Sequence, residues 1–334
     1  MNPRIRIRAL GATLAAGVLL SVTGAAQAQT FPRRPINMII PYPAGGPSDH
    51  IGRQVQPLAS QNLGQNIIVQ NIGGASGTIG ITRALSAPAD GHTVILGSPM
   101  ELIMSPLALQ GVTYKSEDMT LVAHLVSTST ILVVRSNLGV NNLNELIALA
   151  RSSASRPLTY GSVGYGSLYH LIGEKLSQDA RIPLTHVPFR GIAPVMNDLM
   201  GGQIDMAFLP MSGTTMQSVS AGRMIGLGVT AKKPHPLFSR YPALAAMPGL
   251  EDFEFEVWAG VLVHKDTPVA ISQRLSQAFY TALQNTEVRN SLEATGNNVM
   301  SPRSLTELAG FYQREIERYR AIARSINLQP RTAQ

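Results

Sequence analysis

The chain has 334 residues, contains no cysteine and carries 27 basic against 20 acidic residues, a formal net charge of +7. Without cysteine it can form no disulfide, no thiol metal site and no lipid-modified N-terminal cysteine. The basic residues form no block that interleaves with aromatic residues, and the 7 histidines show no metal-type spacing. We therefore exclude nucleic acid as a partner and expect neither a metal nor a cofactor.

The first 28 residues are typical of a secretory signal peptide. Arg4, Arg6 and Arg8 precede a small, apolar run at 9–22, and Ala26-Gln27-Ala28 matches the small-x-small cleavage pattern. The apolar run is shorter than the roughly 20 residues that a membrane span needs. We expect cleavage after Ala28 and a mature chain free in the periplasm or secreted. Loss of the three arginines takes the net charge from +7 to +4, a mild excess that suits an anionic ligand.

Beyond residue 28, short runs rich in β-branched residues alternate with helical patterns. The mature length of about 300 residues suggests roughly two domains. Alternation of strand and helix favours α/β lobes with largely parallel sheets. The predicted strands are Ile36–Ile40, Ile67–Val69, Thr93–Leu96, Ile131–Val134, Asp205–Leu209 and Val261–Val263.

Three capping patterns locate helix starts. Asn142–Glu145 reads as a capping box, and apolar residues follow it at helical spacing. Thr267-Pro268 predicts a cap followed by a proline at the first helical position. Ser304–Glu307 predicts the start of the last helix.

Two loops of small residues repeat one arrangement. The stretch PYPAGGPSD, Pro41–Asp49, follows the first predicted strand and leads into a helix expected from about His50. GSVGYGS, Gly161–Ser167, follows a strand-like run and leads into a helix over Leu168–Leu176. Helix starts attract anions, because their first N–H groups lack partners and the macrodipole is positive there. If each loop belongs to its own lobe, two such ends can face each other and suit a ligand with one or two carboxylates.

Other chemistries fit these residues less well. GSVGYG is not the dinucleotide pattern G-x-G-x-x-G, and neither loop holds a lysine, which argues against a nucleotide phosphate. Ser48-Asp49-His50 are successive residues at a helix start, so their side chains cannot form a catalytic relay. His170 and Glu174 lie four residues apart and are most simply a polar pair on one helix face. Each loop residue alone can be a turn glycine, a cap or a charge at a helix start, so the repeated arrangement carries the functional interpretation.

A series of motifs covers essentially the whole mature chain: PYPAGGPSD, IVQNIGGASGTIG, APADGHTVILGS, LTYGSVGYGSLYH, HVPFRGIAPVMNDLMGGQIDMAF, AGRMIGLGVTAKK and FEVWAGVLVHKDTP. Their order resembles that of the Bug receptors, the TctC family of periplasmic solute-binding proteins of tripartite tricarboxylate transporters. The resemblance implies an α/β fold of two lobes with mixed, largely parallel sheets, a type II-like periplasmic binding protein that closes like a Venus flytrap. It also implies that backbone N–H groups, hydroxyls and ordered waters hold a ligand carboxylate.

The resemblance assigns ligand-binding positions to both loops and to neighbouring turns. In the first lobe these are Tyr42, Ala44, Gly45, Gly46, Ser48, Asp49, Ala75, Ser76 and Ser98. In the second lobe they are Ser162, Gly166, Ser167 and His170, with Phe189, Arg190, Gly191 and Asp205 nearby. Two stretches depart from the family's usual pattern, the turn at 71–77 and the methionine-rich run at 98–104, and both can reshape the pocket. The methionines can pack on an aromatic acid or simply fill the core.

The sequence therefore predicts a periplasmic protein that captures a small organic carboxylate and delivers it to integral membrane transporter subunits, without catalysing a reaction. The ligand is expected to be a dicarboxylate, a tricarboxylate or an aromatic carboxylate. The alternatives are a sensory receptor that presents its liganded form to a membrane signalling protein, and a secreted hydrolase that uses Ser48 or Ser167. We expect a monomer whose first lobe comprises 30–123 and 256–334 and whose second lobe comprises 124–255. We also expect neutral donors, and no arginine, to hold the carboxylate, with Asp49 fixing the first loop.

Overall fold

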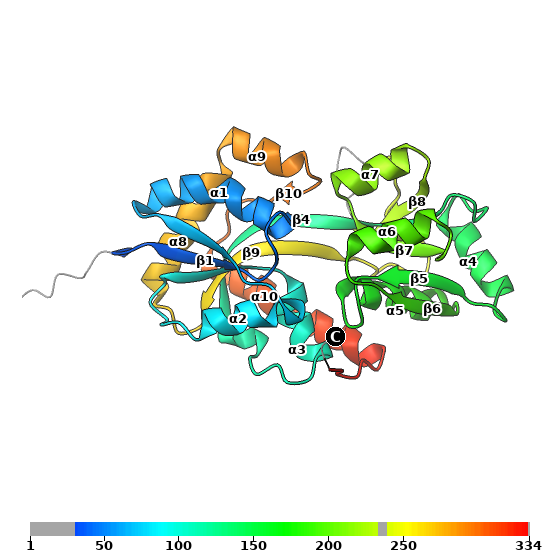
Figure 1. Cartoon of the computed structure of the whole chain (residues 1–334), viewed down its shortest axis with the longest axis horizontal. Helices are drawn as coiled ribbons and strands as arrows, with labels where there is room; N and C mark the ends of the chain where they lie inside the picture. Colours follow the sequence, from blue (N-terminus) through cyan, green and yellow to red (C-terminus); the bar gives the residue numbers. More distant parts are fainter. Residues whose placement is uncertain (1–30, 233–238, 333–334) are drawn as a thin grey trace, which may run out of the picture.

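The structure is a computed structural model that describes residues 31–232 and 239–332 of the chain. The predicted signal peptide and its cleavage site lie outside these residues. Over the described ranges, each helix is too short or too polar to cross a bilayer. Two lobes lie next to each other and are joined by two long strands that run from one to the other (Figure 1).

The first lobe is the left-hand part of Figure 1. At its centre β1 pairs in parallel with both β2 and β3. Four of the five residues of β1 are buried, as expected for a central parallel strand that is covered on both faces. Its strands are β1 (Ile36–Ile40), β2 (Ile67–Asn71), β3 (Thr93–Gly97) and β10 (Asn298–Val299), and its helices are α1 (Pro47–Leu63), α2 (Thr78–Leu85), α3 (Ser105–Ala108), α8 (Val269–Leu283) and α9 (Thr286–Glu293). Single turns are η1 (Ala75–Gly77), η2 (Met100–Met104) and η3 (Ser116–Asp118).

The second lobe repeats the strand–helix alternation. Here β5 pairs in parallel with β6 and β7. Figure 1 places helices on both sides of these strands. The strands are β5 (Leu158–Ser162), β6 (Leu184–Pro188), β7 (Met206–Pro210) and β8 (Met224–Val229), and the helices are α4 (Leu143–Ser152), α5 (Leu168–Ala180), α6 (Ile192–Met200) and α7 (Gly213–Ser220), with a single turn η5 (Leu244–Ala246).

Two long strands, β4 (Met119–Arg135) and β9 (Glu256–His264), cross from lobe to lobe. They pair antiparallel and complete a ten-stranded sheet in the order β2-β1-β3-β9-β4-β7-β5-β6, with β8 and β10 also on β4. The α/β fold of two lobes with a mixed sheet is therefore confirmed. β4 pairs with β9 as far as Ser129 and with β7 from Thr130. The lobe boundaries at 123/124 and 255/256 stay a prediction.

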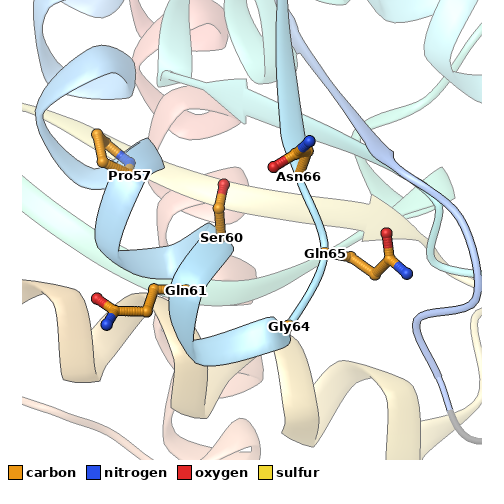
Figure 2. Close-up of a pocket in the computed structure, with 6 residues that line it drawn as sticks. All are labelled: Pro57, Ser60, Gln61, Gly64, Gln65 and Asn66. Atoms are coloured by element: carbon orange, nitrogen blue, oxygen red, sulfur yellow. The ribbon is translucent and has the colours of Figure 1, made fainter.

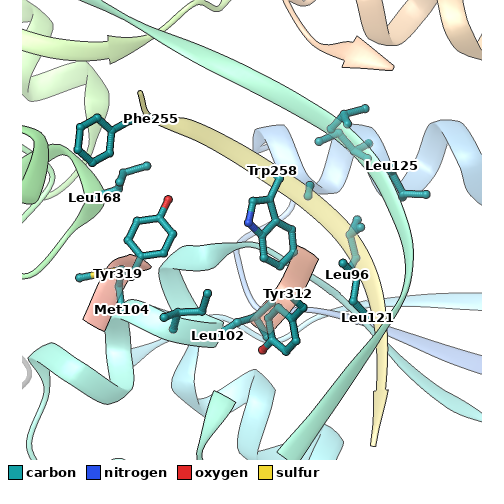
Figure 3. Packing of buried hydrophobic residues seen from close by; sticks show 14 of the residues in the cluster. Leu96, Leu102, Met104, Leu121, Leu125, Leu168, Phe255, Trp258, Tyr312 and Tyr319 are labelled. Carbon is teal, nitrogen blue, oxygen red and sulfur yellow. The ribbon is translucent and has the colours of Figure 1, made fainter. Parts of the chain in front are cut away.

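The hydrophobic core is continuous between the lobes. The last helix, α10 (Leu305–Ser325), contacts both β4 and α5. In Figure 3, Tyr319 of this helix lies near Leu168 of α5 and Phe255, and all three belong to one buried cluster that also includes the core of the first lobe. A smaller, separate cluster in the second lobe is built from residues such as Val195, Leu199, Leu209 and Met216. The lobes thus share packing along α10 in addition to the two strands.

The helix starts follow the sequence closely, with two differences. Asn142 Oδ1 accepts from the N–H of Glu145 at 3.0 Å, and Ser304 and Glu307 form a complete capping box. The helix expected from about His50 begins earlier, at Pro47, because the φ of proline fits the first helical position. The reverse holds at Pro268, which is the N-cap of α8 and still extended with ψ of 138°, so this helix begins one residue later than predicted.

Candidate functional site

The first loop joins β1 to α1, and its shape is fixed by Asp49. Gly45 has a φ of 83°, and its N–H donates to Asp49 Oδ2 at 2.9 Å. Arg53 Nε donates to the same carboxylate at 2.9 Å. The Arg53 guanidinium holds the pKa of this buried carboxyl below its usual range. The Asp49 carboxylate is therefore ionised, its charge is balanced by that of Arg53, and it bonds to the backbone of its own loop.

The start of α1 keeps backbone donors available. Gly46 is the N-cap, and no side chain caps the helix. Within the described residues, the N–H groups of Ala44, Gly46 and Ser48 donate to no protein acceptor, and Ala44 is exposed. Free N–H groups at the positive end of a 17-residue helix are a ready site for an anion.

A buried acid lies directly beneath this loop. Glu101 is 0% exposed, and its carboxylate accepts from the Tyr42 hydroxyl and the Ser98 hydroxyl, each at 2.7 Å, and from the Ser98 N–H. Burial raises the pKa of Glu101. It sits in η2, a π-helical turn, a distortion that is frequent at functional sites. Sequence reasoning missed Glu101, although a lone acid within the apolar run MELIM was a pattern that could have indicated it.

The turn at 73–77 borders the first loop. Ala75 and Ser76 both have positive φ, 44° and 53°, and both are exposed. The Ser76 carbonyl accepts from Ser105 Oγ at 3.0 Å, which ties the turn to the start of α3. A side chain on Gly73 would meet Pro43 at 3.3 Å, so the turn and the loop are in close contact.

The second loop, between β5 and α5, uses most of its own donors. The N–H of Gly164 donates to Ser162 Oγ and that of Gly166 donates to His170 Nδ1, each at 3.1 Å. Ser167 caps α5 by accepting from the N–H of His170 at 3.3 Å. Ser162, Gly166, Ser167 and His170 are all buried. The N–H groups of Gly164, Gly166 and Ser167 are therefore tied to the loop itself, whereas those of Val163 and Tyr165 donate to no protein acceptor within the described residues.

Aromatic rings back the second loop. The rings of His170 and His186 lie 4.2 Å apart, and Tyr165 packs on His170 at 4.7 Å. Burial first, and then the charge of Arg331, lower the pKa of His186 to about 4, and burial with the charges of His186 and Arg331 lowers that of His170 to about 3. Both imidazoles are neutral near pH 7.

The serines of the two loops lack the geometry of a catalytic triad. Ser162 Oγ and His186 Nε2 are 2.7 Å apart, but a histidine with a pKa of about 4 is a weak base for activating a serine. Ser167 serves as a helix cap. Asp49 bonds to Gly45 and Arg53 rather than to its neighbour His50.

The segment η2–α3 brings the two loops to one place. The N–H of Leu168 donates to Met100 Sδ at 3.4 Å, while the next residue, Glu101, binds Tyr42. A Cβ on Gly166 would lie 2.1 Å from the Cβ of Ala108, so the second loop presses against α3. Loops about 120 residues apart in sequence therefore meet across one methionine-bearing turn. Of the two methionines weighed from the sequence, Met104 is core and Met100 lies between the loops.

Some of the predicted positions lie at the edge of this arrangement or outside it. The Phe189 N–H donates to the Ser162 carbonyl at 2.9 Å, and Gly191, with φ of 123°, is the N-cap of α6. Arg190 between them is exposed. Asp205 is not brought to the loop: it precedes β7, at the other end of these strands, where it pairs with Arg135 at 2.9 Å and accepts from Thr159. Asp205 joins three strands and is not a candidate ligand contact.

A cavity of about 430 Å³ lies elsewhere, at the far end of α1 (Figure 2). It is lined by uncharged residues such as Ser60, Gln61 and Asn66. Its lining on α1 begins at Pro57, about 15 Å along the helix from its start at Pro47. It is therefore independent of the two loops.

A family model described as "Tripartite tricarboxylate transporter family receptor", TctC, matches residues 51–328. The chain belongs to this receptor family. The resemblance to the Bug receptors that the motifs indicated is thus confirmed. Like other members, the receptor is a solute-binding protein of the periplasmic type.

Solved structures of other receptors match along nearly their whole length. The periplasmic binding protein BugD is 25% identical, with a TM-score of 0.75, over 90% of this receptor and 100% of BugD. MatC from Rhodopseudomonas palustris with bound malate is 28% identical, with a TM-score of 0.74, over 87% and 99%. A second R. palustris protein, solved with adipate, is 27% identical, with a TM-score of 0.78, over 90% and 100%.

Proposed function

We propose that this receptor binds a small organic carboxylate between its two loops and delivers it to the integral membrane subunits of a tripartite transporter. The observation that carries the proposal is the meeting of the two loops at Met100–Glu101, with open helix-start donors on the first loop. The malate and adipate of the two R. palustris proteins support a dicarboxylate as the ligand class.

The first loop supplies the anion site in this proposal. The N–H groups of Ala44, Gly46 and Ser48 lie at or just before the start of α1 and can donate charge-assisted hydrogen bonds to one carboxylate. Asp49 does not repel the ligand, because its charge is already neutralised by Arg53. Neither loop holds a lysine or an arginine, so in this proposal neutral donors hold the ligand, and Arg190 is exposed.

In this proposal the second loop covers the carboxylate that is bound at the first loop. Its buried serines and rings exclude water, and a lower local dielectric strengthens the hydrogen bonds of the first loop. A ligand that touches both loops shifts the balance between open and closed forms by its extra affinity for the closed one. The closed form is what a membrane partner would recognise. The receptor acts as a monomer in this scheme and performs no covalent chemistry.

The ligand is identified by thermal shift and calorimetry with the mature protein. The panel contains malate, adipate, a tricarboxylate and aromatic mono- and dicarboxylates. A true ligand at 100 times its dissociation constant should raise the free energy of unfolding by about 2.7 kcal/mol.

The matched control is Gly46→Val, whose side chain would occupy the space in front of the free N–H groups of the first loop. A Cβ at Gly46 has only the Pro43 carbonyl near it, at 3.5 Å, so the variant should fold and fail to bind. No response to any carboxylate, or equal binding by Gly46→Val, would contradict the proposal. Uptake of the identified ligand into vesicles with reconstituted membrane subunits, dependent on added receptor, tests the delivery step.

A further inference from the structure

A second cavity lies away from the two loops, where the lobes are joined. Its volume is about 220 Å³, and it lies between the crossover strands and the last helix. The walls that matter are His124 of β4, Glu256 and Trp258 of β9, Arg303 before α10, and Phe311 and Glu315 of α10. Figure 3 shows Trp258 on the strand that faces this helix.

This cavity contains an acid and a base that are not paired. Among the described residues, neither Glu256 nor Arg303 has an ion-pair partner within 4.0 Å, although both line the cavity. The nitrogens of Arg303 and the carboxylate oxygens of Glu256 are therefore also more than 4.0 Å from each other. Burial raises the pKa of Glu256, the nearby charges of Glu254 and Glu315 raise it further, and Arg318 and Ser127 of the same lining oppose this rise only in part. A further cationic group beside Glu256 would stabilise its ionised form and lower this pKa.

The remaining acids of the cavity already have partners. Glu315 accepts from Trp258 Nε1 at 3.0 Å and pairs with Arg318 at 3.3 Å. Glu254 pairs with Lys232 at 3.4 Å. The charges left for a ligand are thus one negative and one positive.

The third polar feature is a buried histidine. His124 is 1% exposed, and in the described structure its Nδ1 has no hydrogen-bond partner. Its ring stacks on that of Phe311 at 4.7 Å, and the Arg303 guanidinium lies over the same Phe311 ring, 5.3 Å from its centre. A buried polar atom without a partner is costly, so a ligand that approaches the ring gains by satisfying it.

We infer that this cavity binds a small zwitterion of the amino-acid class, with its ammonium group at Glu256 and its carboxylate at Arg303. A simple carboxylate or a simple amine would leave one of the two charges in the cavity unpaired. The volume is below the range of about 300–1,000 Å³ typical of sites for drug-sized ligands, which restricts the ligand to a few heavy atoms. The site is separate from the loops and adds a second ligand to the proposed carboxylate.

The fluorescence of Trp258 tests the inference, since it is the chain's sole tryptophan and lines the cavity. The mature protein is titrated with glycine, alanine and glycine betaine, with acetate and ethylamine as probes of a single charge. The inference predicts a saturable change with at least one zwitterion and none with the single-charge probes. The titration is repeated in Gly46→Val, where the loop site is blocked, and the same change is expected.

Two variants and two matched controls locate the site. Glu256→Gln and Arg303→Gln should each weaken zwitterion binding by about tenfold or more, since each removes a charged hydrogen-bond partner. Glu251→Gln and Arg314→Gln change exposed residues outside the cavity and should have no effect. Thermal unfolding verifies that each variant folds. If Glu256→Gln does not fold, the affinity of Arg303→Gln alone tests the inference.

Unchanged affinity in a folded Arg303→Gln variant overturns the inference. A protein that binds dicarboxylates but shows no saturable change with any zwitterion also overturns it, and leaves the loop site standing.

Discussion

The two glycine-rich loops share a sequence pattern and differ in what their backbone does. In the first loop, Ala44 is exposed, and the N–H groups of Gly46 and Ser48 meet no protein acceptor in the described chain. In the second loop, the N–H groups of Gly164 and Gly166 are bonded to side chains of the same loop. A strand, a glycine-rich loop and a helix start therefore do not by themselves decide which N–H groups stay unpaired, since in the second loop only those of Val163 and Tyr165 do among the described residues. For an anion site, the loop must also leave its donors unused.

The difference suggests a division of labour. In the proposed function the first loop binds the charge of the ligand, and its own acid pairs with Arg53. The second loop packs, through Gly166 against Ala108 and through its rings against one another. Three experiments can break or sharpen this comparison.

The largest effect is expected from adding one methyl group to each loop. In Gly166→Ala the new Cβ would lie 2.1 Å from that of Ala108, at a φ of 74°. Overpacking of about 1–3 kcal/mol and left-handed strain of about 1–2 kcal/mol should together lower the free energy of unfolding. Gly46→Ala has a φ of −81° and space around it, so its stability should stay within about 0.5 kcal/mol.

Urea denaturation measures both variants. Solution scattering of Gly166→Ala then shows whether the lobes have moved apart. Equal stability of the two variants would mean that the second loop does not pack as the structure shows.

On acidification, the two loops should lose their contributions to stability in different pH ranges. Folding keeps His170 and His186 neutral, with pKa values of about 3 and about 4, whereas the unfolded chain takes up protons below about 6.5. The second loop therefore loses stability as the pH falls from about 6.5 toward 4. The pKa of Asp49 is lowered, so its contribution is present above about 3.9 and is lost only below that pH.

Denaturation midpoints between pH 7 and 4 test this order. His170→Gln should flatten the loss of stability, whereas Asp49→Asn should leave its slope unchanged in that range. His124, whose pKa is also lowered to about 3, acts in the same direction, so the slope should be reduced and not abolished. A steeper slope in His170→Gln would contradict the neutral imidazoles.

The smallest effect concerns the two serines. Ser167 caps α5, so Ser167→Ala should cost about 1 kcal/mol of stability and little ligand affinity. Ser48 caps nothing within the described residues, so Ser48→Ala should leave stability unchanged. Thermal unfolding and calorimetry with the identified carboxylate separate the two effects. A large loss of affinity in Ser167→Ala at normal stability would make its hydroxyl a ligand contact instead.

The sequence by itself determined the local structure and the family. Ile36–Ile40 and Leu158–Ser162 are apolar, β-branched or small, and the glycines and prolines after them end each strand and start a helix. The capping residues Asn142 and Ser304 lie where their side chains can reach the third residue of a helix, and they cap as predicted. These features depend on residues only a few positions apart, so they can be predicted from the sequence.

Tertiary structure alone decided which parts of the pattern can act on a ligand. Glu101 lies beneath Tyr42 because β1 and η2 are neighbours in space. Asp205 lies away from the second loop because it precedes β7, and the loop follows β5, the parallel neighbour of β7, at the opposite end of these strands. The N–H of Gly166 is lost to His170, and that of Leu168, at the start of the next helix, to Met100 from the other lobe. Whether a backbone N–H is free depends on what the rest of the fold places beside it, and contacts over about 70 residues leave no periodic trace in the sequence.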